Sequence, residues 1–222
     1  MKILVFDTET TGLPQSRLSS VINTEQFPHI VQLSYIVYDM SNNEVKVIND
    51  TIIKLPYSIH IPEESEKIHN ISNEISREKG IPIKTALLKF IDDLQKCDLL
   101  VAHNIEFDVN MITVELIRLN KKTSTEEINE AYAIFDKIPK YCTMSENKLF
   151  CNILSTTKSG KPFIKYPSLT ELHFKMFNIN PKYMHNSLND ILICLRCYYY
   201  QKTNKDICDE NAELKELLSH IT

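Results

Sequence analysis

The chain begins with a short apolar run that is followed by two acidic residues. Residues 2–6 read Lys-Ile-Leu-Val-Phe, and Asp7-Thr8-Glu9 follows immediately. A continuous apolar run of this length is typical of a strand that is buried on both faces. Gly12 and Pro14 interrupt the pattern soon afterwards, as expected where a strand ends. The sequence therefore predicts that its first strand lies at the centre of a sheet, with other layers packed on it.

Two further strands are expected directly after the first. Residues 30–39 and 45–55 are rich in β-branched and aromatic residues and partly alternate between apolar and polar. Ser41-Asn42-Asn43 between them has the composition of a turn. This order predicts an antiparallel meander that starts at strand one.

The hydrophobic period then changes to that of helices. A fourth strand is expected at 98–102, whereas residues 136–167 follow no clear pattern and contain an expected loop at 158–162. This mixed α/β pattern predicts one domain over residues 1–222, with its core at about 1–203. Helices are predicted at 62–70, 72–79 with Ser72 as N-cap, 83–96, 107–119, 125–135, 168–177, 188–201 and 209–220.

The charge balance argues against a module that binds duplex DNA by neutralising phosphates. The 222 residues carry a net charge of −4, whereas such modules are usually basic. The objection is weaker for a metal-dependent nuclease, because its site must be acidic to hold the cations that receive the phosphate.

The sequence favours an intracellular, cytoplasmic location. No signal peptide and no apolar stretch of about 20 residues is recognisable, so no contact with a membrane is expected. The six cysteines are then expected to be reduced. Cys194 and Cys197 have CxxC spacing, but they lie in a helical pattern without a second ligand pair, which favours structural thiols over zinc or redox chemistry.

The first chemical signal is the acid pair at the end of the first strand. Asp7 and Glu9 are two residues apart, so an extended chain points both side chains to the same side. Neighbouring carboxylates repel unless a positive charge lies between them, and hard oxygen ligands suit Mg²⁺ and Mn²⁺. The alternative is a pair of solvated acids at a strand end.

Two later segments carry further candidates. Asp108 ends the sequence HNIEFD, which opens a helix directly after the fourth strand; N-terminal capping is the alternative role for this acid. His185 and Asp190 lie in HNSLND, and the apolar run after Asp190 implies that its carboxylate needs a partner. A histidine titrates close to neutral pH and so suits a general base. The alternatives are a loop histidine and an ordinary acid of a first helical turn.

In this order the motifs DxE, HNxxFD and HxxxxD resemble the DEDDh exonucleases, also called the DnaQ-like family, which includes the proofreading epsilon subunit of DNA polymerase III and ribonuclease T. The segment 67–72 (KIHNIS) is similar to the family's IHGIT segment, with Asn70 in place of Gly, and 168–172 (SLTEL) is similar to its SLxxL segment. The resemblance spans residues 2–200. The chain departs from compact members in a longer stretch between Asp108 and His185, and a sliding-clamp peptide is not recognisable at its C-terminus.

The resemblance implies a ribonuclease H-like fold, with a mixed central sheet flanked by helices, and a mechanism that uses two divalent cations. Mg²⁺ is the expected ion, and Mn²⁺ would substitute. Asp7, Glu9 and Asp190 would hold the first ion, and Asp7 would bridge to the second with Asp108 nearby. His185 would take the proton from the attacking water.

By the same resemblance, some residues would contact the terminal nucleotide. Leu13 would pack against its base, although Leu13 and Phe107 are alternatively core residues. Lys158, Lys161 and Lys165 are candidates for the phosphate backbone, with a solvated loop as the alternative. The expected substrate-binding residues are Thr8, Thr10, Leu13, Asn104 and Phe107.

The expected function is a metal-dependent 3′→5′ exonuclease that releases nucleoside monophosphates from DNA or RNA, in proofreading or end trimming. The expected partner is a single-stranded or frayed 3′ end, and a polymerase is a candidate protein partner. The alternative is a non-catalytic nucleic-acid-binding or polymerase-accessory module on the same fold. Such a module would not need the chemical positions Asp7, Glu9, Asp108, His185 and Asp190, all of which are filled.

Overall fold

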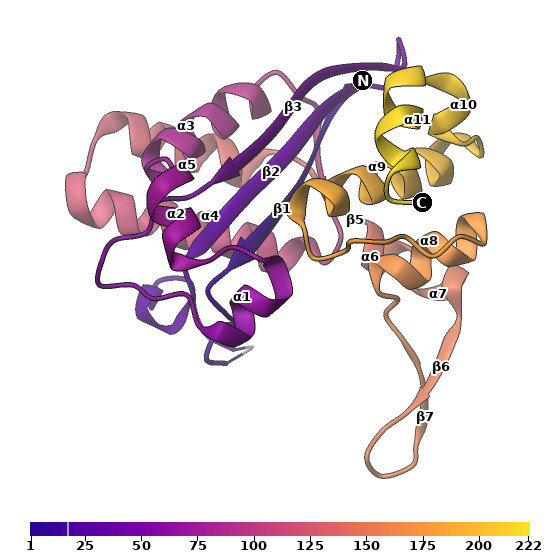
Figure 1. The fold of residues 1–222 in the computed structure, drawn as a ribbon, viewed down its shortest axis with the longest axis horizontal. Coiled ribbons are helices and arrows are strands. Elements are labelled where there is room, and N and C mark those ends of the chain that lie inside the picture. Colours follow the sequence, from indigo (N-terminus) through magenta and orange to yellow (C-terminus); the bar gives the residue numbers. More distant parts are fainter. Residues whose placement is uncertain (17) are drawn as a thin grey trace.

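A computed structural model describes residues 1–16 and 18–222, and within them the main sheet has five strands in the order β3-β2-β1-β4-β5 (Figure 1). β1 pairs antiparallel with β2, and β2 with β3, so the predicted meander is confirmed. β4 and β5 add to the other side of β1 as parallel strands. The sheet is therefore mixed, and β1 lies at its centre. The strands are β1 Lys2–Thr10, β2 Ile30–Asp39, β3 Glu44–Ile52, β4 Leu99–Ala102 and β5 Lys140–Cys142.

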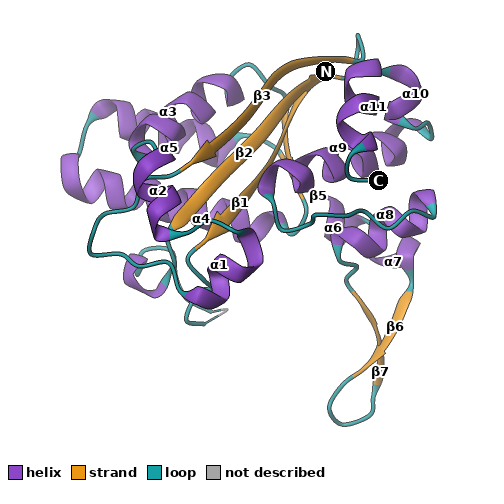
Figure 2. Ribbon diagram, in the orientation of Figure 1, coloured by secondary structure: helices purple, strands orange, loops and turns teal. Residues whose placement is uncertain are grey.

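Helices cover both faces of this sheet (Figure 2). α3 (Ile83–Leu94), α4 (Ile105–Thr123) and α5 (Glu126–Lys137) supply one cover, whereas α9 (Ser187–Thr203) is the main helix on the other face. The remaining helices are the 3₁₀ turn Thr24–Gln26, α1 Glu63–His69, α2 Asn73–Lys79, α6 Thr143–Glu146, α7 Lys148–Cys151, α8 Leu169–Phe177, α10 Ile207–Glu210 and α11 Ala212–Ser219. Among the described residues, none of the helices combines the length and apolar character that crossing a membrane requires.

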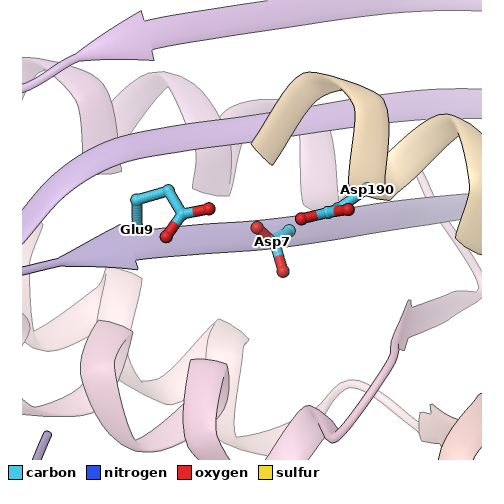
Figure 3. Close-up of side chains that lie close together, drawn as sticks. All are labelled: Asp7, Glu9 and Asp190. Carbon is cyan, nitrogen blue, oxygen red and sulfur yellow. The ribbon is translucent and has the colours of Figure 1, made fainter. Parts of the chain in front are cut away.

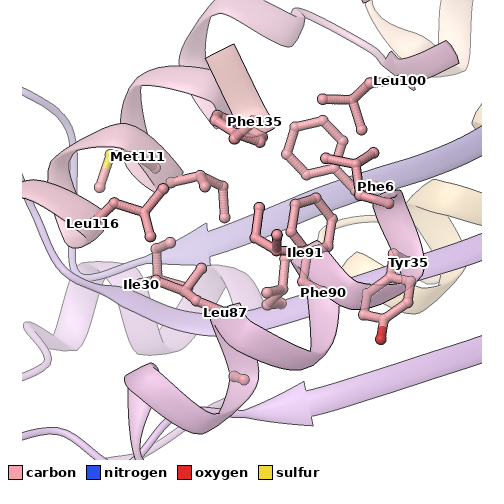
Figure 4. Packing of buried hydrophobic residues seen from close by; sticks show 14 of the residues in the cluster. Phe6, Ile30, Tyr35, Leu87, Phe90, Ile91, Leu100, Met111, Leu116 and Phe135 are labelled. Carbon is pink, nitrogen blue, oxygen red and sulfur yellow. The ribbon is translucent and has the colours of Figure 1, made fainter. Parts of the chain in front are cut away.

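The side chains of β1 alternate between two cores. Leu4 and Phe6 point toward α3, α4 and α5, where Phe90 packs against Phe6 and Tyr35 with ring centroids 5.5 and 5.3 Å apart (Figure 4). Burial of several large aromatic and aliphatic side chains supplies most of the stability of such a layer.

Ile3 and Val5 point to the opposite face and pack with α9. Cys194 and Cys197 are buried on α9, where thiols behave as small apolar groups. This layer continues to the C-terminal helices, because the Asn211 side chain donates to the Asn43 carbonyl oxygen (2.8 Å) in the turn between β2 and β3. The helices after α9 are thereby joined to the edge of the sheet.

Several predicted boundaries are wrong. The helix expected at 209–220 is divided into α10 and α11, because Asn211 is extended and its side chain caps the second helix by accepting from Leu214 N (2.9 Å). The helix expected at 107–119 runs from Ile105 to Thr123, and the strand expected at 45–55 ends at Ile52. In these cases, caps and tertiary contacts decided the ends rather than the apolar pattern.

The stretch 136–167, for which the sequence shows no clear pattern, contains β5, two short helices and a separate hairpin. The hairpin pairs β6 (Ile153–Thr156) antiparallel with β7 (Pro162–Lys165). The expected loop at 158–162 forms its turn, with Pro162 already in β7. The alternation is weak because these strands are only four residues long and none of their residues is fully buried.

Candidate active site

The site forms where β1 extends beyond its parallel neighbour. β4 pairs with β1 only from Ile3 to Val5, whereas β2 follows β1 as far as Thr10. From Asp7 onward, the β4-side edge of β1 is therefore free to accept groups from other elements. Asp7 and Glu9 project to the same side of the strand, as their spacing predicts (Figure 3).

Asp108 reaches this open edge from α4. The chain leaves β4 through Asn104, whose left-handed backbone (φ +63°) turns it directly into the helix. Oδ1 of Asp108 accepts from the backbone N–H of Thr8 (3.0 Å) and from its hydroxyl (2.7 Å). Asp108 is only 3% exposed, so these bonds hold a nearly buried carboxylate against β1.

Asp190 reaches the site from the first turns of α9. The Asn186 side chain caps this helix, and the Ser187 hydroxyl donates to the Asp7 carbonyl oxygen (2.8 Å), which fixes the helix against β1. Oδ2 of Asp190 accepts from the His185 backbone N–H (3.1 Å). His185 itself is exposed and has a left-handed backbone (φ +64°), an uncommon conformation that residues at functional sites adopt more often than others.

Three carboxylates converge as a result. Asp7, Glu9 and Asp190 each offer an oxygen atom, and these atoms all lie within 4.8 Å of one another. Figure 3 shows the first two side chains on β1 and the third coming from α9, all facing a common centre. Oδ1 of Asp190 is buried and has no hydrogen-bond partner among the described residues. An unpartnered buried carboxylate oxygen is costly, so this position fits a ligand that carries positive charge.

The pKa values of the cluster agree with that fit. Burial, followed by the charges of Asp7, Asp190 and Asp108, raises the pKa of Glu9 to about 9. Burial and the charge of Asp7 raise the pKa of Asp190 to about 8, and burial raises that of Asp7 to about 6. Without a cation, Glu9 and Asp190 therefore retain protons near neutral pH, whereas Asp7 is largely ionised. Oxygen ligands crowded in this way suit Mg²⁺, Mn²⁺ or Ca²⁺.

A cavity of about 470 Å³ opens over the cluster. Of the predicted substrate-binding residues, Thr8, Asn104 and Phe107 line this cavity. Leu13 and Thr10 do not belong to the described lining of this cavity. Leu13 is 81% exposed, and the Thr10 hydroxyl donates to the Gly12 carbonyl oxygen (2.6 Å). The other lining residues are Asp7, Glu9, His103, Asp108, Met144, Pro167, Ser168, Leu169, Thr170, Met184, His185 and Asp190.

His103 lines the cavity, although the sequence suggested no role for it. Its Nδ1 lies 2.9 Å from the Thr143 hydroxyl, and its Nε2 lies 3.1 Å from the Pro167 carbonyl oxygen. Burial lowers its pKa to about 4, so the ring is neutral near pH 7. His103 thus joins the end of β4 to the far wall of the cavity. Its place in HNIEFD was visible in the sequence, but its partners are distant along the chain.

Comparison with solved structures shows the same fold in exonuclease I. The structure of E. coli exonuclease I in complex with a dT13 oligonucleotide superposes with a TM-score of 0.63 at 14% identity, over 91% of this chain and 41% of that chain. Exonuclease I from Methylocaldum szegediense gives 0.61 at 14% identity, over 92% and 41%. The present chain thus spans about two fifths of the length of these proteins, and the shared part has the ribonuclease H-like exonuclease fold.

A search of curated proteins found no significant match to the sequence. The family model described as "Exonuclease" matches residues 4–198, which include all of α4, most of β1 and of α9, and all the acids of the cluster. Because this match covers most of the sequence, the chain belongs to the exonuclease family, as its DnaQ-like motifs predicted.

Proposed function

We propose that this exonuclease domain is a divalent-metal-dependent 3′→5′ exonuclease of the DEDDh type, which releases nucleoside monophosphates. The observation that supports this proposal best is the convergence of Asp7, Glu9 and Asp190 around one point, with Oδ1 of Asp190 unpartnered among the described residues. Folding raises the pKa of these acids because it buries them and brings them together. A bound cation would offset the resulting repulsion, and such shifted groups are common at functional sites.

The proposed ligand sets follow the positions of the acids. Asp7, Glu9 and Asp190 would hold one Mg²⁺ or Mn²⁺ ion, and Asp7 and Asp108 would hold a second. When bound, the cations would supply Lewis-acid stabilisation of charge on the scissile phosphate and would favour ionisation of a water molecule.

The protein's own side chains would deprotonate the attacking water and orient the groups around it. His185 is exposed at the cavity, and the imidazole would accept the proton of the attacking water. Asp190 holds the backbone of His185 through its Oδ2, which limits the positions that this ring can take. Thr8 orients Asp108 by donating to its carboxylate from both the backbone N–H and the hydroxyl.

The proposed substrate is a single-stranded or frayed 3′ end of DNA or RNA. Solved structures of exonuclease I contain dT13 and dA16 oligonucleotides, and those ligands are single strands. In this chain, Phe107 and Asn104 line the cavity beside the acids and would contact the terminal nucleotide. Apolar and stacking contacts tolerate any base, which end trimming or proofreading requires. A polymerase is the proposed protein partner for proofreading.

The alternative, a non-catalytic nucleic-acid-binding module, does not account for the acid cluster. A binding module would be served better by a cavity without buried carboxylates, since these repel phosphate when no cation is present. The filled positions of all five chemical residues therefore favour the enzyme.

A degradation assay tests the proposal. Single-stranded DNA and RNA labelled at the 5′ end should be shortened stepwise in Mg²⁺ or Mn²⁺, with mononucleotide products, and should stay intact in EDTA. Asp7→Asn should lower the rate at least a hundredfold, on the order of the loss expected for removal of a transition-state charge interaction. Asp136→Asn, an exposed acid on α5, is the matched control and should retain the wild-type rate.

Three results would contradict the proposal. Full activity of Asp7→Asn would overturn the site assignment, and immediate release of the 5′ label would overturn the polarity. Absence of hydrolysis by the folded wild-type protein on every DNA and RNA end would favour the non-catalytic module.

A further inference from the structure

A hairpin arm projects from the body of the protein beside the cavity. The arm is defined here as residues 147–166, which comprise α7, β6 and β7, and its two strands extend away from the sheet and helices (Figures 1 and 2). Leu154 is 75% exposed and Phe163 is 44% exposed. They lie on opposite faces of the ribbon, because Leu154 pairs with Ile164 and Phe163 pairs with Ser155. An isolated two-stranded ribbon is at best marginally stable in water, so binding of a ligand to these exposed side chains would stabilise the arm.

The arm is strongly basic in an acidic chain. It contains Lys148, Lys158, Lys161 and Lys165, and residues 147–170 contain no Asp or Glu, although the whole chain has a net charge of −4. Lys165 pairs with Glu171, whereas Lys158 and Lys161 are exposed at the tip. Segregation of positive charge onto one projecting element gives that element an attraction for polyanions.

The tip presents its lysines from an ordered turn. The Thr157 N–H donates to the Lys161 carbonyl oxygen, and the Gly160 N–H donates to the Thr157 carbonyl oxygen, both at 2.9 Å. Gly160 has a φ of +81°, a backbone conformation that residues other than glycine rarely adopt. Lys158 and Lys161 therefore emerge from a fixed backbone, which lowers the entropy cost of placing them on a ligand.

The arm is continuous with the wall of the cavity. Pro167, Ser168 and Thr170 line the cavity immediately after β7, and the Pro167 carbonyl oxygen is held by His103. Tyr166 is the last residue of the arm before this wall; it is half exposed, and the Nζ atom of Lys148 lies 4.4 Å from its ring centroid. A polymer whose end occupies the cavity would meet Tyr166 and Lys148 first when it leaves on this side.

The arm also has a useful reach. At ~3.3 Å per residue, the segment from Lys161 to Pro167, which contains β7, spans on the order of 20 Å. At ~3.4 Å or more per nucleotide, this distance corresponds to at most about six nucleotides of a single strand. The tip would thus contact phosphates well upstream of a nucleotide bound at the acids.

We propose that the arm is a second nucleic-acid contact site, which binds the single strand upstream of its 3′ end while the terminal nucleotide occupies the cavity. The proposal rests on the exonuclease function proposed above. Lys158 and Lys161 would contact phosphates, and Tyr166 and Phe163 would stack on bases. Exposed aromatic rings interspersed with lysines, without acids, match the needs of a sequence-tolerant single-strand site. Residues 147–170 contain no acid that could pair with basic groups of a protein partner, so a polyanion fits this segment better than a protein surface of mixed charge.

Substrate length separates the arm from the active site. The double variant Lys158→Glu/Lys161→Glu should raise KM at least tenfold for a single strand of about 20 nucleotides, with little change in kcat. The same variant should hydrolyse a trinucleotide, or the p-nitrophenyl ester of thymidine 5′-monophosphate, at the wild-type rate, because these substrates are too short to reach the tip. Lys137→Glu/Lys215→Glu is the matched control: it changes the same charge on α5 and α11, at two exposed positions.

Salt dependence identifies phosphate contacts. In the Asp7→Asn background without divalent cations, binding of a fluorescent single strand should weaken with salt, and the slope of log Kd against log salt should fall by about 0.7 for each lost phosphate contact. Lys158→Gln/Lys161→Gln should therefore reduce the slope by about 1.4 relative to the parent protein. Phe163→Ala/Tyr166→Ala should weaken binding about fivefold or more while the slope stays unchanged.

The outcomes distinguish this inference from the proposed function. Unchanged KM and salt slope in the lysine variants, with active wild-type protein, would overturn the nucleic-acid role of the arm and favour a protein partner for it. Hydrolysis of neither the long strand nor the p-nitrophenyl ester by the wild-type protein would instead overturn the proposed function.

Discussion

Asp108 and Asp190 are both carboxylates at helix beginnings, but their oxygen atoms have different surroundings. Oδ1 of Asp108 accepts two hydrogen bonds from Thr8, whereas Oδ1 of Asp190 has no partner among the described residues. The resemblance implied that Thr8 contacts substrate. Its hydroxyl group is 2.7 Å from Asp108 and the residue is only 5% exposed, so orientation of Asp108 is the role that the geometry favours.

Substitution of Thr8 tests this positioning role. Thr8→Val keeps the side-chain shape and the backbone N–H bond but removes the hydroxyl donor, so we expect kcat to fall about tenfold and KM for an oligonucleotide to stay within about twofold. Thr8→Ser should restore most of kcat, because it restores the donor. A rise in KM with unchanged kcat in Thr8→Val would instead indicate that Thr8 binds the substrate directly.

Among the elements, α2 shows how a short helix is fixed beside the sheet. The buried Ser76 hydroxyl donates to the Ile53 carbonyl oxygen (2.8 Å) and accepts from the Leu55 N–H (3.1 Å), just beyond the end of β3. Gly80 follows the helix and lies against the same backbone: a Cβ atom there would be 2.5 Å from Lys54 N and 2.7 Å from Ile53 C. Gly80 has φ −72° and ψ 146°, so any residue could adopt its backbone conformation, and only close packing requires glycine.

This close approach predicts a steric cost for alanine. Gly80→Ala should lower the free energy of unfolding by about 1–3 kcal/mol, because the methyl group overlaps backbone atoms that cannot rotate away. Lys79→Ala, at the exposed neighbouring position in α2, is the control and should change stability by less than ~0.5 kcal/mol. Equilibrium unfolding in urea measures both, and equal midpoints for Gly80→Ala and the wild-type protein would show that α2 moves away without cost.

At the scale of the whole molecule, the acid cluster lies at the meeting point of the central strand and both helical layers. α4 belongs to the layer on one face, α9 to the layer on the other, and each contributes a carboxylate to the end of β1. Repulsion between the carboxylates therefore opposes the association of β1, α4 and α9, and a bound cation would favour that association. Binding of a ligand to the folded state alone raises stability by mass action.

This arrangement predicts how stability depends on pH without metal. The pKa of Glu9 is raised to about 9 and that of Asp190 to about 8, whereas unfolded carboxyl groups titrate near pH 4. The folded chain thus keeps protons that the unfolded chain has lost, so the contribution is fully present below about pH 4 and is lost as the pH rises through about 8 to 9. In EDTA, we expect Tm to fall by about 3 °C or more between about pH 5.5 and about pH 9.

Scanning fluorimetry with and without Mn²⁺ measures this effect. Mn²⁺ should raise Tm more at about pH 8.5 than at about pH 5.5, because protons compete with the cation at low pH. Glu9→Gln removes one of the strongly shifted groups and should reduce the pH dependence in EDTA, whereas Asp136→Asn should leave it unchanged. A Tm in EDTA that rises with pH across this range would contradict the coupling of these acids.

The sequence alone determined the local features of this protein. The alternation within β1 placed Asp7 and Glu9 on one side, Ser72 and Ser168 marked two helix starts, and the apolar run of residues 2–6 indicated the central strand. Each of these features depends on neighbours a few residues away, so propensity, period and capping express it directly. The order of the three acidic motifs also indicated the family.

Only the tertiary structure decided which groups meet. Thr8 and Asp108 are 100 residues apart, and Ser187 and Asp7 are 180 apart, so no local pattern contains these contacts. The same holds for the contact of His103 with Pro167 and for the projecting arm, whose weak four-residue strands lack a buried face to impose a period. Local physics selected the elements, but the packing of α4 and α9 on opposite faces of one short strand edge brought the acids together.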